Sequence, residues 1–262
     1  MNNTKIFLKD ENVFNKIITA ANLKKEDIVI EIGSGDGRLT KRIAPIAKKV
    51  YAIEIDTNLY DFSRTMIDNK NIEFINADAL SIDLPMDANK IISNLPYAIS
   101  SPITEKIIRF LNKKGNGMAI LMYQLEFGER MLAFPGIRDY SMISVFTQYT
   151  CNVELISKVS KNSFRPKPAV ESIIIKLTPK KINIDEGFLS FTKLLFQHKK
   201  KNLYSALLDS RSNLNLSKDD IRDKLEKFKY KNQLKRKVFY LDIKELENIY
   251  NEMVELGICK KI

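Results

Sequence analysis

Five short apolar runs, spaced about 20 residues apart, constrain the fold of this chain more than any other feature. They cover residues 28–32, 50–54, 72–75, 91–94 and 118–122. Each interval leaves room for one crossover helix, and strands connected through such helices run parallel in one sheet. The pattern therefore predicts a doubly wound, Rossmann-like α/β domain whose sheet is covered by helices on both faces.

Two further kinds of element follow this alternating region. Helical periodicity occurs near 124–134 and 140–149, and β-rich runs follow at 153–159 and 169–177. A loop that contains prolines joins the two β-rich runs. We therefore expect them to close the sheet as an antiparallel pair.

Beyond residue 178 the chain has helical patterning throughout. Helices are predicted to begin near Ser217 and near Asp242, because each is followed three residues later by an acid at capping-box spacing. We expect an α/β domain at 1–178 and a small all-α domain at 179–262.

The net charge of +11 is concentrated toward the C-terminus. Residues 1–178 carry 24 basic and 20 acidic side chains, whereas residues 179–262 carry 19 and 12. Such an excess is typical of proteins that contact a polyanion, most often a nucleic acid. A well-solvated lysine-rich surface is the alternative that charge alone leaves open.

The scarcity of cysteine and histidine argues against several chemistries. Cys151 and Cys259 lie far apart in the sequence, with no other ligand at metal-binding spacing, so we expect neither a disulfide framework nor a metal site. His198 is the only histidine, which disfavours a catalytic triad. No apolar run approaches the roughly 18–20 residues that span a bilayer, and no signal peptide opens the chain. We therefore expect a cytoplasmic protein without membrane contact.

A glycine cluster lies directly after the first predicted strand. Gly33, Gly35 and Gly37 allow a tight strand-to-helix turn, and the free amides at the helix start can face polar atoms of a bound nucleoside. The steric need of the turn is by itself an alternative explanation. Arg38 stands where a dinucleotide fingerprint has its later glycine, and this disfavours a pyrophosphate ligand.

Acidic side chains follow the next two strands. Glu54 lies 21 residues after Gly33, where doubly wound folds place the acid that binds both ribose hydroxyls. Asp78 follows the third strand and is placed to accept a hydrogen bond from an adenine amino group. Either acid alone is more often a solvated strand end, but together with the glycines they lie along one edge of the sheet. A nucleoside that carries an amino acid instead of phosphates suits this lining, and S-adenosylmethionine is such a molecule.

The fourth predicted strand ends in Asn94-Leu95-Pro96-Tyr97. The amino nitrogen of adenine is a poor nucleophile because its lone pair is delocalised into the ring, whereas a sulfonium methyl group needs no activation. The Asn94 oxygen and a backbone carbonyl in the proline turn can accept both N–H bonds and direct the lone pair toward the methyl group. Tyr97 is placed to stack on the base. An Asn-Pro turn beside a core tyrosine is the structural alternative.

A second aromatic candidate, Phe164, lies in the loop before the last β-rich run. Pro166 and Pro168 stiffen this loop, and the charged neighbours of Phe164 favour an exposed ring at its tip over a buried one. We expect Phe164 to hold a target base from the side opposite Tyr97. A base of folded RNA must be unstacked to enter such a pocket, and loops supply unstacked bases.

Three motifs together make the chain resemble the small-subunit ribosomal RNA adenine N6,N6-dimethyltransferases, in particular their archaeal branch. They are Glu31-Ile32-Gly33-Ser34-Gly35-Asp36-Gly37, Asn94-Leu95-Pro96-Tyr97, and Phe164 with Pro166, Pro168, Val170 and Ser172. The resemblance implies a class I methyltransferase fold and S-adenosylmethionine as methyl donor. It also implies that two adjacent adenosines in the 3′-terminal hairpin loop of small-subunit rRNA become N6,N6-dimethyladenosine during ribosome assembly.

The resemblance further implies the residues of the site. The donor site comprises Leu8, Gly33, Gly35, Glu54, Asp78 and Asn94, and the target-base site comprises Asn94, Pro96, Tyr97 and Phe164. Where the family has Gln-Xaa-Phe-Leu near the N-terminus, this chain has Lys5-Ile6-Phe7-Leu8.

We expect residues 1–178 to form the catalytic domain that binds S-adenosylmethionine and residues 179–262 to form a helical domain that helps dock the RNA. The basic run Lys199, Lys200 and Lys201 in that domain fits phosphate contacts at a helix start, with a solvated surface as the alternative. The expected partner is small-subunit rRNA or the pre-small ribosomal subunit, bound by a monomer. Two other functions remain open: a large-subunit rRNA adenine dimethylase of the antibiotic-resistance type, and a non-catalytic RNA-binding assembly or transcription factor on the same fold. The intact Asn94-Leu95-Pro96-Tyr97 motif argues against the second.

Overall fold

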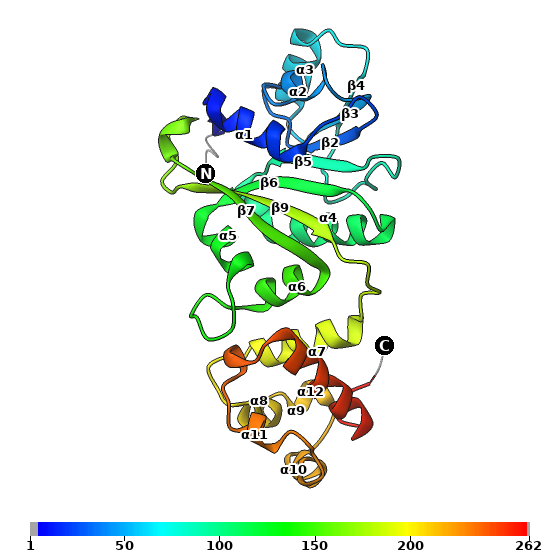
Figure 1. Ribbon diagram of the computed structural model, residues 1–262, viewed down its shortest axis with the longest axis vertical. Coiled ribbons are helices and arrows are strands. Elements are labelled where there is room, and N and C mark those ends of the chain that lie inside the picture. Colours follow the sequence, from blue (N-terminus) through cyan, green and yellow to red (C-terminus); the bar gives the residue numbers. More distant parts are fainter. Residues whose placement is uncertain (1–4, 261–262) are drawn as a thin grey trace. The chain divides into compact units, whose positions relative to one another are not determined.

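A seven-stranded sheet forms the centre of the computed structural model, which describes residues 5–260 (Figure 1). The strand order is β4–β3–β2–β5–β6–β9–β7. The strands are β2 (Ile28–Ile32), β3 (Lys49–Glu54), β4 (Ile72–Asn76), β5 (Lys90–Asn94), β6 (Met118–Gln124), β7 (Cys151–Val159) and β9 (Ser172–Pro179). The five predicted parallel strands are confirmed, and β7 and β9 form the predicted antiparallel pair. The expectation about a signal peptide concerns residues 1–4, which lie outside the described residues.

Helices alternate with the strands and make up the C-terminal part. Those up to residue 163 are α1 (Glu11–Ala21), α2 (Thr40–Ile43), α3 (Thr57–Met66), η1 (Tyr97–Ile99), α4 (Ser100–Lys114), α5 (Leu125–Leu132), α6 (Met142–Thr150) and η2 (Lys161–Ser163). The later ones are α7 (Glu186–Phe196), α8 (Leu203–Asp209), α9 (Arg211–Leu214), α10 (Lys218–Glu226), α11 (Lys231–Leu234), η3 (Val238–Tyr240) and α12 (Ile243–Glu255). The predicted capping boxes are confirmed at the starts of α10 and α12. No helix in the described part of the chain is both long and apolar enough to cross a membrane.

The direction of winding reverses at β2. From this strand, β3 and β4 extend the sheet to one side, and β5 and β6 extend it to the other. Ligands of doubly wound folds bind outside the carboxyl ends of the strands at such a switch point. The glycine loop after β2 and the Asn94 turn after β5 therefore lie at the same edge of the sheet.

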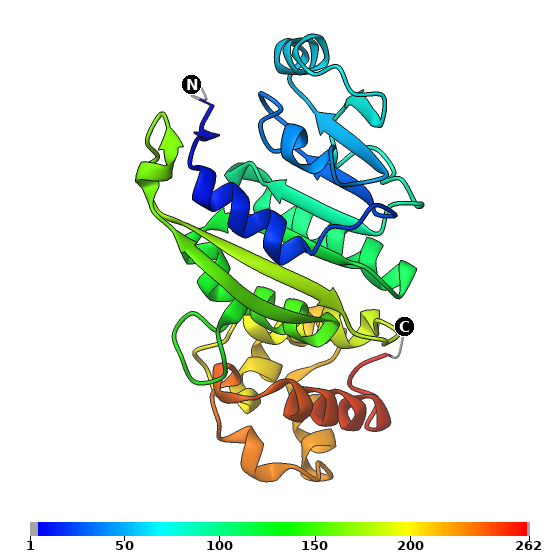
Figure 2. The same ribbon diagram turned by 45° about the horizontal axis from the view of Figure 1, so that its top comes forward.

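Successive side chains of β6 point to opposite faces of the sheet. Ile120 and Met122 belong to a core cluster that includes Phe14 of α1. Tyr123, one residue on, faces the other side, where its hydroxyl lies 2.8 Å from that of Thr104 on α4. Helices α1 and α4 thus cover opposite faces, as Figure 2 shows.

A second, two-stranded sheet was not predicted. It pairs β1 (Phe7–Leu8) with β8 (Phe164–Arg165), antiparallel, with Leu8 opposite Phe164. Strands of two residues carry no periodicity, so the sequence pattern contains no signal for them.

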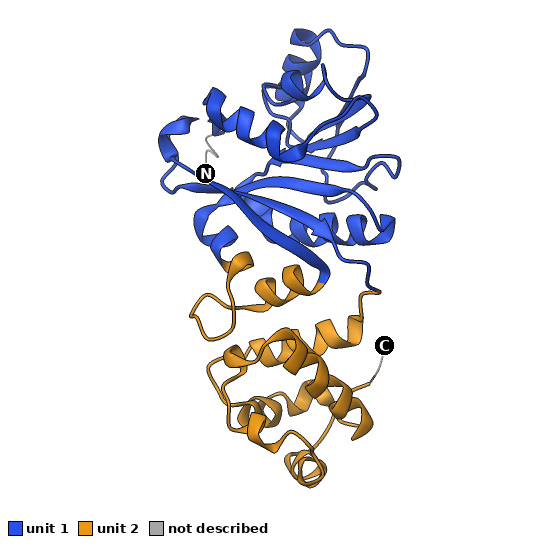
Figure 3. Ribbon diagram, in the orientation of Figure 1, with its two compact units in different colours: residues 1–129, 150–182 blue, residues 130–149, 183–262 orange. Residues whose placement is uncertain are grey.

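The chain packs as two compact units (Figure 3). Unit 1 comprises residues 1–129 and 150–182, and unit 2 comprises residues 130–149 and 183–262. The change at residue 182 lies close to the boundary expected near 178, but the segment 130–149 packs with the C-terminal helices. Aromatic contacts join it to them, because the Tyr140 ring lies 5.5 Å from the Phe196 ring and the Tyr149 ring lies 4.8 Å from the Phe188 ring.

A buried ion pair joins α1, β2 and β5 at the edge of the sheet opposite the glycine loop. Lys90 Nζ lies 2.7 Å from an Asp27 oxygen and donates to the carbonyls of Ala21 and Asn22 at the end of α1. Burial alone would raise the pKa of Asp27, but hydrogen bonds from Lys90, Asn89 and the Lys24 amide hold that pKa below its ordinary value. The end of α1 and the starts of β2 and β5 are therefore held together by one buried, hydrogen-bonded ion pair.

We predict that Lys90→Met lowers the free energy of unfolding by about 3–5 kcal/mol, because it leaves the Asp27 carboxylate buried without its cation. Urea titration monitored by circular dichroism measures this cost. Lys158→Met is the matched control, since Lys158 pairs with Glu129 at the surface, and its cost should stay below about 1 kcal/mol. Equal effects of the two substitutions would show that the buried pair does not hold the sheet.

Candidate active site

A cavity of about 730 Å³ lies in unit 1 at the carboxyl ends of β2, β3 and β5. Its walls bring together eight of the nine residues predicted for the donor and base sites, namely Leu8, Gly33, Gly35, Glu54, Asn94, Pro96, Tyr97 and Phe164. The volume lies in the range of small-molecule sites. The ninth, Asp78, does not line the cavity.

Gly33 allows the glycine loop and the Asn94 turn to touch. It has a φ of 71°, which disfavours any other residue. A Cβ atom at this position would lie 3.2 Å from the Pro96 ring, closer than side chains usually approach. The proline therefore packs directly on the glycine, and the two motifs share one cavity wall.

Glu54 is buried at the end of β3, where both of its carboxylate oxygens are held by backbone amides. Oε2 accepts a hydrogen bond from Gly35 N and Oε1 accepts one from Asp56 N, each at 2.9 Å. Each oxygen retains a further lone pair for a ligand. The carboxylate is thus fixed at the cavity wall, in position to accept from a diol.

Asp78 lies in the turn after β4 and serves that turn. Its Oδ1 accepts from the Leu80 amide at 2.9 Å, and its Oδ2 accepts from the Ser81 hydroxyl at 3.2 Å. A contact between Asp78 and an adenine amino group stays a prediction.

The Asn94 turn offers two acceptors to the cavity. Within the described residues, neither the Asn94 side chain nor the Leu95 carbonyl has a hydrogen-bond partner, whereas the Pro96 carbonyl accepts from Ile99 N at 3.2 Å. Pro96 itself has no N–H to compete for these acceptors. An amino group that enters the cavity can therefore donate to the Asn94 amide oxygen and to the Leu95 carbonyl.

Tyr97 is tied to the end of the proline-containing loop. Its hydroxyl lies 2.7 Å from the hydroxyl of Ser172, the last residue of the third motif. Burial raises the pKa of Tyr97, against the opposing effect of this hydrogen bond, so the hydroxyl stays protonated. The second and third sequence motifs are joined here by one contact.

The expectation that Phe164 is exposed at a loop tip is wrong. The ring is only 2% exposed and belongs to the same core cluster as Leu8, which lies opposite it in the β1–β8 pair. Strand pairing turns this side chain inward, although its neighbour Arg165 is exposed. Phe164 still forms part of the cavity wall.

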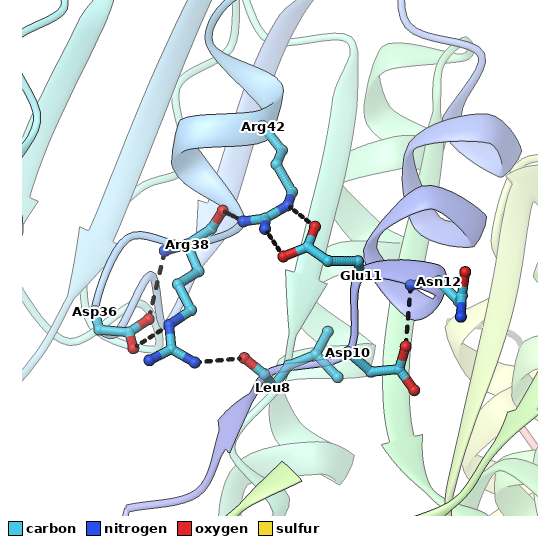
Figure 4. A network of polar contacts seen from close by, with 7 residues as sticks. All are labelled: Leu8, Asp10, Glu11, Asn12, Asp36, Arg38 and Arg42. Atoms are coloured by element: carbon cyan, nitrogen blue, oxygen red, sulfur yellow. Dashed lines mark hydrogen bonds and ion pairs between the residues drawn. The ribbon is translucent and has the colours of Figure 1, made fainter. Parts of the chain in front are cut away.

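The segment before α1 covers the glycine loop through the polar network in Figure 4. Arg38 lies 2.9 Å from Asp36 and donates through Nη1 to the Leu8 carbonyl at 3.3 Å. Arg42 pairs with Glu11 in the first turn of α1.

On the cavity side of this segment, the Phe7 ring lies 3.5 Å from where a Gly35 Cβ would be. Lys5, which stands at the first position of the N-terminal motif, forms an ion pair with Asp56. The N-terminal segment therefore contacts the glycine loop with Lys5 in place of the glutamine that the resemblance implied.

Glu31 is a cavity residue that the motif contains but for which the sequence suggested no role. It is 2% exposed, lines the cavity, and its Oε2 accepts from the Thr40 hydroxyl at 2.5 Å. Burial raises the pKa of Glu31 to about 8, against the Thr40 hydrogen bond and together with repulsion from Glu54 and Asp36. Its place one residue before the end of β2 was the signal that could have identified it.

The lysine run lies in unit 2, in the turn before α8, whose N-cap is Asn202. Lys199 donates through Nζ to the carbonyls of Arg138 and Tyr140, each at 2.9 Å, and Lys201 pairs with Asp209 at 2.6 Å. Lys200 is exposed and has no ion-pair partner among the described residues. Phosphate binding by the run stays a prediction.

A doubly wound sheet with a glycine loop after β2, an acid at the end of β3 and an antiparallel last pair of strands defines the class I methyltransferases. A crystal structure of a dimethyladenosine transferase from Plasmodium falciparum is similar over 97% of this chain and 99% of its own, with a TM-score of 0.82 and 30% identity. The structure of the 23S rRNA methyltransferase ErmE shares the fold, with a TM-score of 0.67 and 24% identity over 94% of this chain and 98% of its own.

Within that class, this chain belongs to the ribosomal RNA adenine dimethylase family, whose model matches residues 2–245. A probable ribosomal RNA small subunit methyltransferase A from Methanococcus maripaludis is 42% identical over 239 residues, which is 89% of each chain. The predicted family and fold are confirmed.

We predict that Glu31→Gln removes a pH dependence of stability. The unfolded chain releases the Glu31 proton near its ordinary pKa of 4.5, whereas the folded chain keeps it to about pH 8. The wild type should therefore lose stability as the pH rises from about 4.5 to about 8, and the neutral glutamine should not. Urea unfolding at pH 5 and pH 8.5 should show E31Q gaining more than about 1 kcal/mol relative to wild type at the higher pH. A constant difference would contradict the buried, protonated carboxyl.

Proposed function

We propose that this protein transfers methyl groups from S-adenosylmethionine to the N6 atoms of two adjacent adenosines in the 3′-terminal hairpin loop of small-subunit rRNA. One observation carries this proposal: the free Asn94 amide and the Leu95 carbonyl lie in the same cavity as the fixed Glu54 carboxylate. Family membership and the 42% identity to the archaeal small-subunit relative support the substrate. The pre-small ribosomal subunit in the cytoplasm is the proposed partner.

The cavity lining fits S-adenosylmethionine. Glu54 presents a fixed carboxylate for the ribose hydroxyls, and Ile55 and Leu59 supply apolar contacts beside it for the adenine ring. Arg38, the cation nearest the glycine loop, is held by Asp36 and the Leu8 carbonyl. The donor carries no phosphate, so it does not require a free cation at this position. Glu31 lines the same cavity, and the carbonyl oxygen of its protonated carboxyl group can accept a hydrogen bond from the donor's ammonium group.

The chain's own residues orient the acceptor base. S-adenosylmethionine supplies a methyl group that is already activated as a sulfonium substituent. Asn94 Oδ1 and the Leu95 carbonyl accept the two hydrogens of the adenine amino group, which directs the nitrogen lone pair across the cavity. The same acceptors stabilise the positive charge that develops on nitrogen during transfer. Tyr97, held by Ser172, and Phe164 line the cavity around the base.

Incubation with labelled methyl donor and unmethylated small subunits tests this function directly. We expect incorporation into small-subunit rRNA and a primer-extension stop at two adjacent adenosines near its 3′ end. Incorporation into large-subunit rRNA alone would instead support the antibiotic-resistance type of activity. Binding of subunits without incorporation would support a non-catalytic assembly or transcription factor.

We predict that Asn94→Ala lowers single-turnover methyl transfer by at least about 100-fold, because it removes an acceptor needed in the transition state. Binding of small subunits should stay within about twofold of wild type. Asn116→Ala, in the exposed turn before β6, is the matched control and should leave transfer unchanged. Asn94→Asp keeps an acceptor oxygen and should retain more activity than Asn94→Ala. Equal transfer by Asn94→Ala and the control would refute the role of Asn94.

A further inference from the structure

The Asn94 turn, residues 94–97, is held at its start by the backbone of β6. Asn94 lies opposite Met122 in the parallel register of β5 and β6, and the next residue, Leu95, donates through its amide to the Met122 carbonyl at 3.3 Å. The strand ladder does not extend to the end of the turn, because β5 ends at Asn94. Other contacts must therefore fix the position of Tyr97, which begins η1.

Ser100, at the start of α4, provides the first of these contacts. The helix begins without the usual side-chain cap, because its N-cap residue is Ile99, whose side chain has no hydrogen-bond acceptor. The buried Ser100 hydroxyl instead donates back to the Tyr97 carbonyl at 3.0 Å. The first turn of α4 thus holds η1, so the contacts that fix this turn also fix the position of Tyr97.

Thr104 and Tyr123 connect the first turn of α4 to β6. Thr104 Oγ1 donates to the Ser100 carbonyl at 2.5 Å and lies 2.8 Å from the Tyr123 hydroxyl. A hydroxyl has one proton and a carbonyl has none, so Thr104 uses its proton on the carbonyl and the Tyr123 hydroxyl donates to Thr104. Burial raises the pKa of Tyr123, against the opposing effect of Thr104, so the donating proton stays in place.

These bonds form a chain that runs from the sheet to the Asn94 turn. From Tyr123 it passes through Thr104 and Ser100 to the Tyr97 carbonyl. A helical threonine often bonds the carbonyl four residues earlier, but the donation from Tyr123 ties this threonine to the sheet. Tyr123 directly follows Met122, so two consecutive residues of β6 hold the two ends of the turn.

We propose that Thr104 and Tyr123 are positioning residues for methyl transfer, which set where the Asn94 turn stands in the cavity. Both side chains are fully buried, and neither lines the cavity, so they act through the turn and not on the ligands. Loss of either hydroxyl lets the start of α4 shift relative to β6 and displaces Tyr97. A shift of about 1 Å at a reacting group costs roughly 100-fold in rate. The inference rests on the proposed function in one respect, namely that the Asn94 turn orients the base.

The test compares single-turnover methyl transfer, at saturating S-adenosylmethionine and unmethylated small subunits, in variants that each lose one hydroxyl. Thr104→Val and Tyr123→Phe should each lower the rate by roughly 10- to 100-fold. Dissociation constants for the donor and for the subunits should stay within about twofold of wild type, because the lost contacts matter in the transition state. Thr104→Ser keeps the hydroxyl and should transfer at close to the wild-type rate.

Two buried hydroxyls of unit 2 provide matched controls. The side chains of Tyr140 and Thr192 are fully buried, and their hydroxyls have no hydrogen-bond partner among the described residues. Tyr140→Phe and Thr192→Val therefore make the same chemical changes as the test variants without breaking a hydrogen bond. Both controls should leave the rate of transfer unchanged.

The double variant Thr104→Val with Tyr123→Phe tests whether the two hydroxyls act as one chain. Effects of residues in one hydrogen-bond network are not additive. The double variant should therefore lose no more rate than the slower single variant. Losses that multiply would show two independent effects and would overturn the chain.

The outcomes separate this inference from the proposed function. If wild type transfers methyl groups and the two single variants are as fast as the controls, the positioning role is wrong and the proposed function stands. If wild type transfers none, the proposed function fails and this inference fails with it. If transfer and donor binding fall together, the hydroxyls maintain the fold as a whole, which overturns the inference. If Thr104→Val does not fold, Tyr123→Phe, which removes a single oxygen, decides.

Discussion

The contact between Gly33 and the Pro96 ring is the constraint on which the site depends. Because Gly33 has no side chain, the turn after β5 can approach the loop after β2 at the point where the sheet reverses its winding. The contact places the free acceptors of Asn94 and Leu95 in the same cavity as the Glu54 carboxylate. A donor pocket and an acceptor pocket thereby become one site.

Segments from far along the chain complete the cavity that this contact begins. The β1–β8 pair places Leu8 beside Phe164, and the bond between Tyr97 and Ser172 fixes the start of η1 to the beginning of β9. Arg38 joins the glycine loop to the Leu8 carbonyl. Residues that orient a base must themselves be held by neighbours, and here each is held by a different part of the fold.

The basic side chains of unit 2 include two distinct groups. Lys199, Lys201 and Arg236 bind backbone carbonyls or acids of their own unit and so stabilise its loops. Arg138, Lys200 and Lys237 are exposed and have no ion-pair partners in the described structure. A count of charges cannot separate these groups, because the difference between them lies in which carbonyls and acids the fold brings within reach.

The sequence by itself determined the parallel strands, the antiparallel edge pair, the capping boxes of α10 and α12, and eight of the residues that line the cavity. These features depend on local patterns: apolar periodicity, residues at strand ends, and acids three positions after a cap. Only the tertiary structure decided that Phe164 is buried, that Asp78 serves its own turn, that Glu31 holds its proton, and that residues 130–149 pack with the C-terminal helices. For Phe164, Glu31 and residues 130–149 the physical reason is that burial, pKa and packing depend on neighbours that are distant in the chain, and a local pattern does not contain them. Asp78 bonds to Leu80 and Ser81, which are local, and only the fold shows that it does not line the cavity.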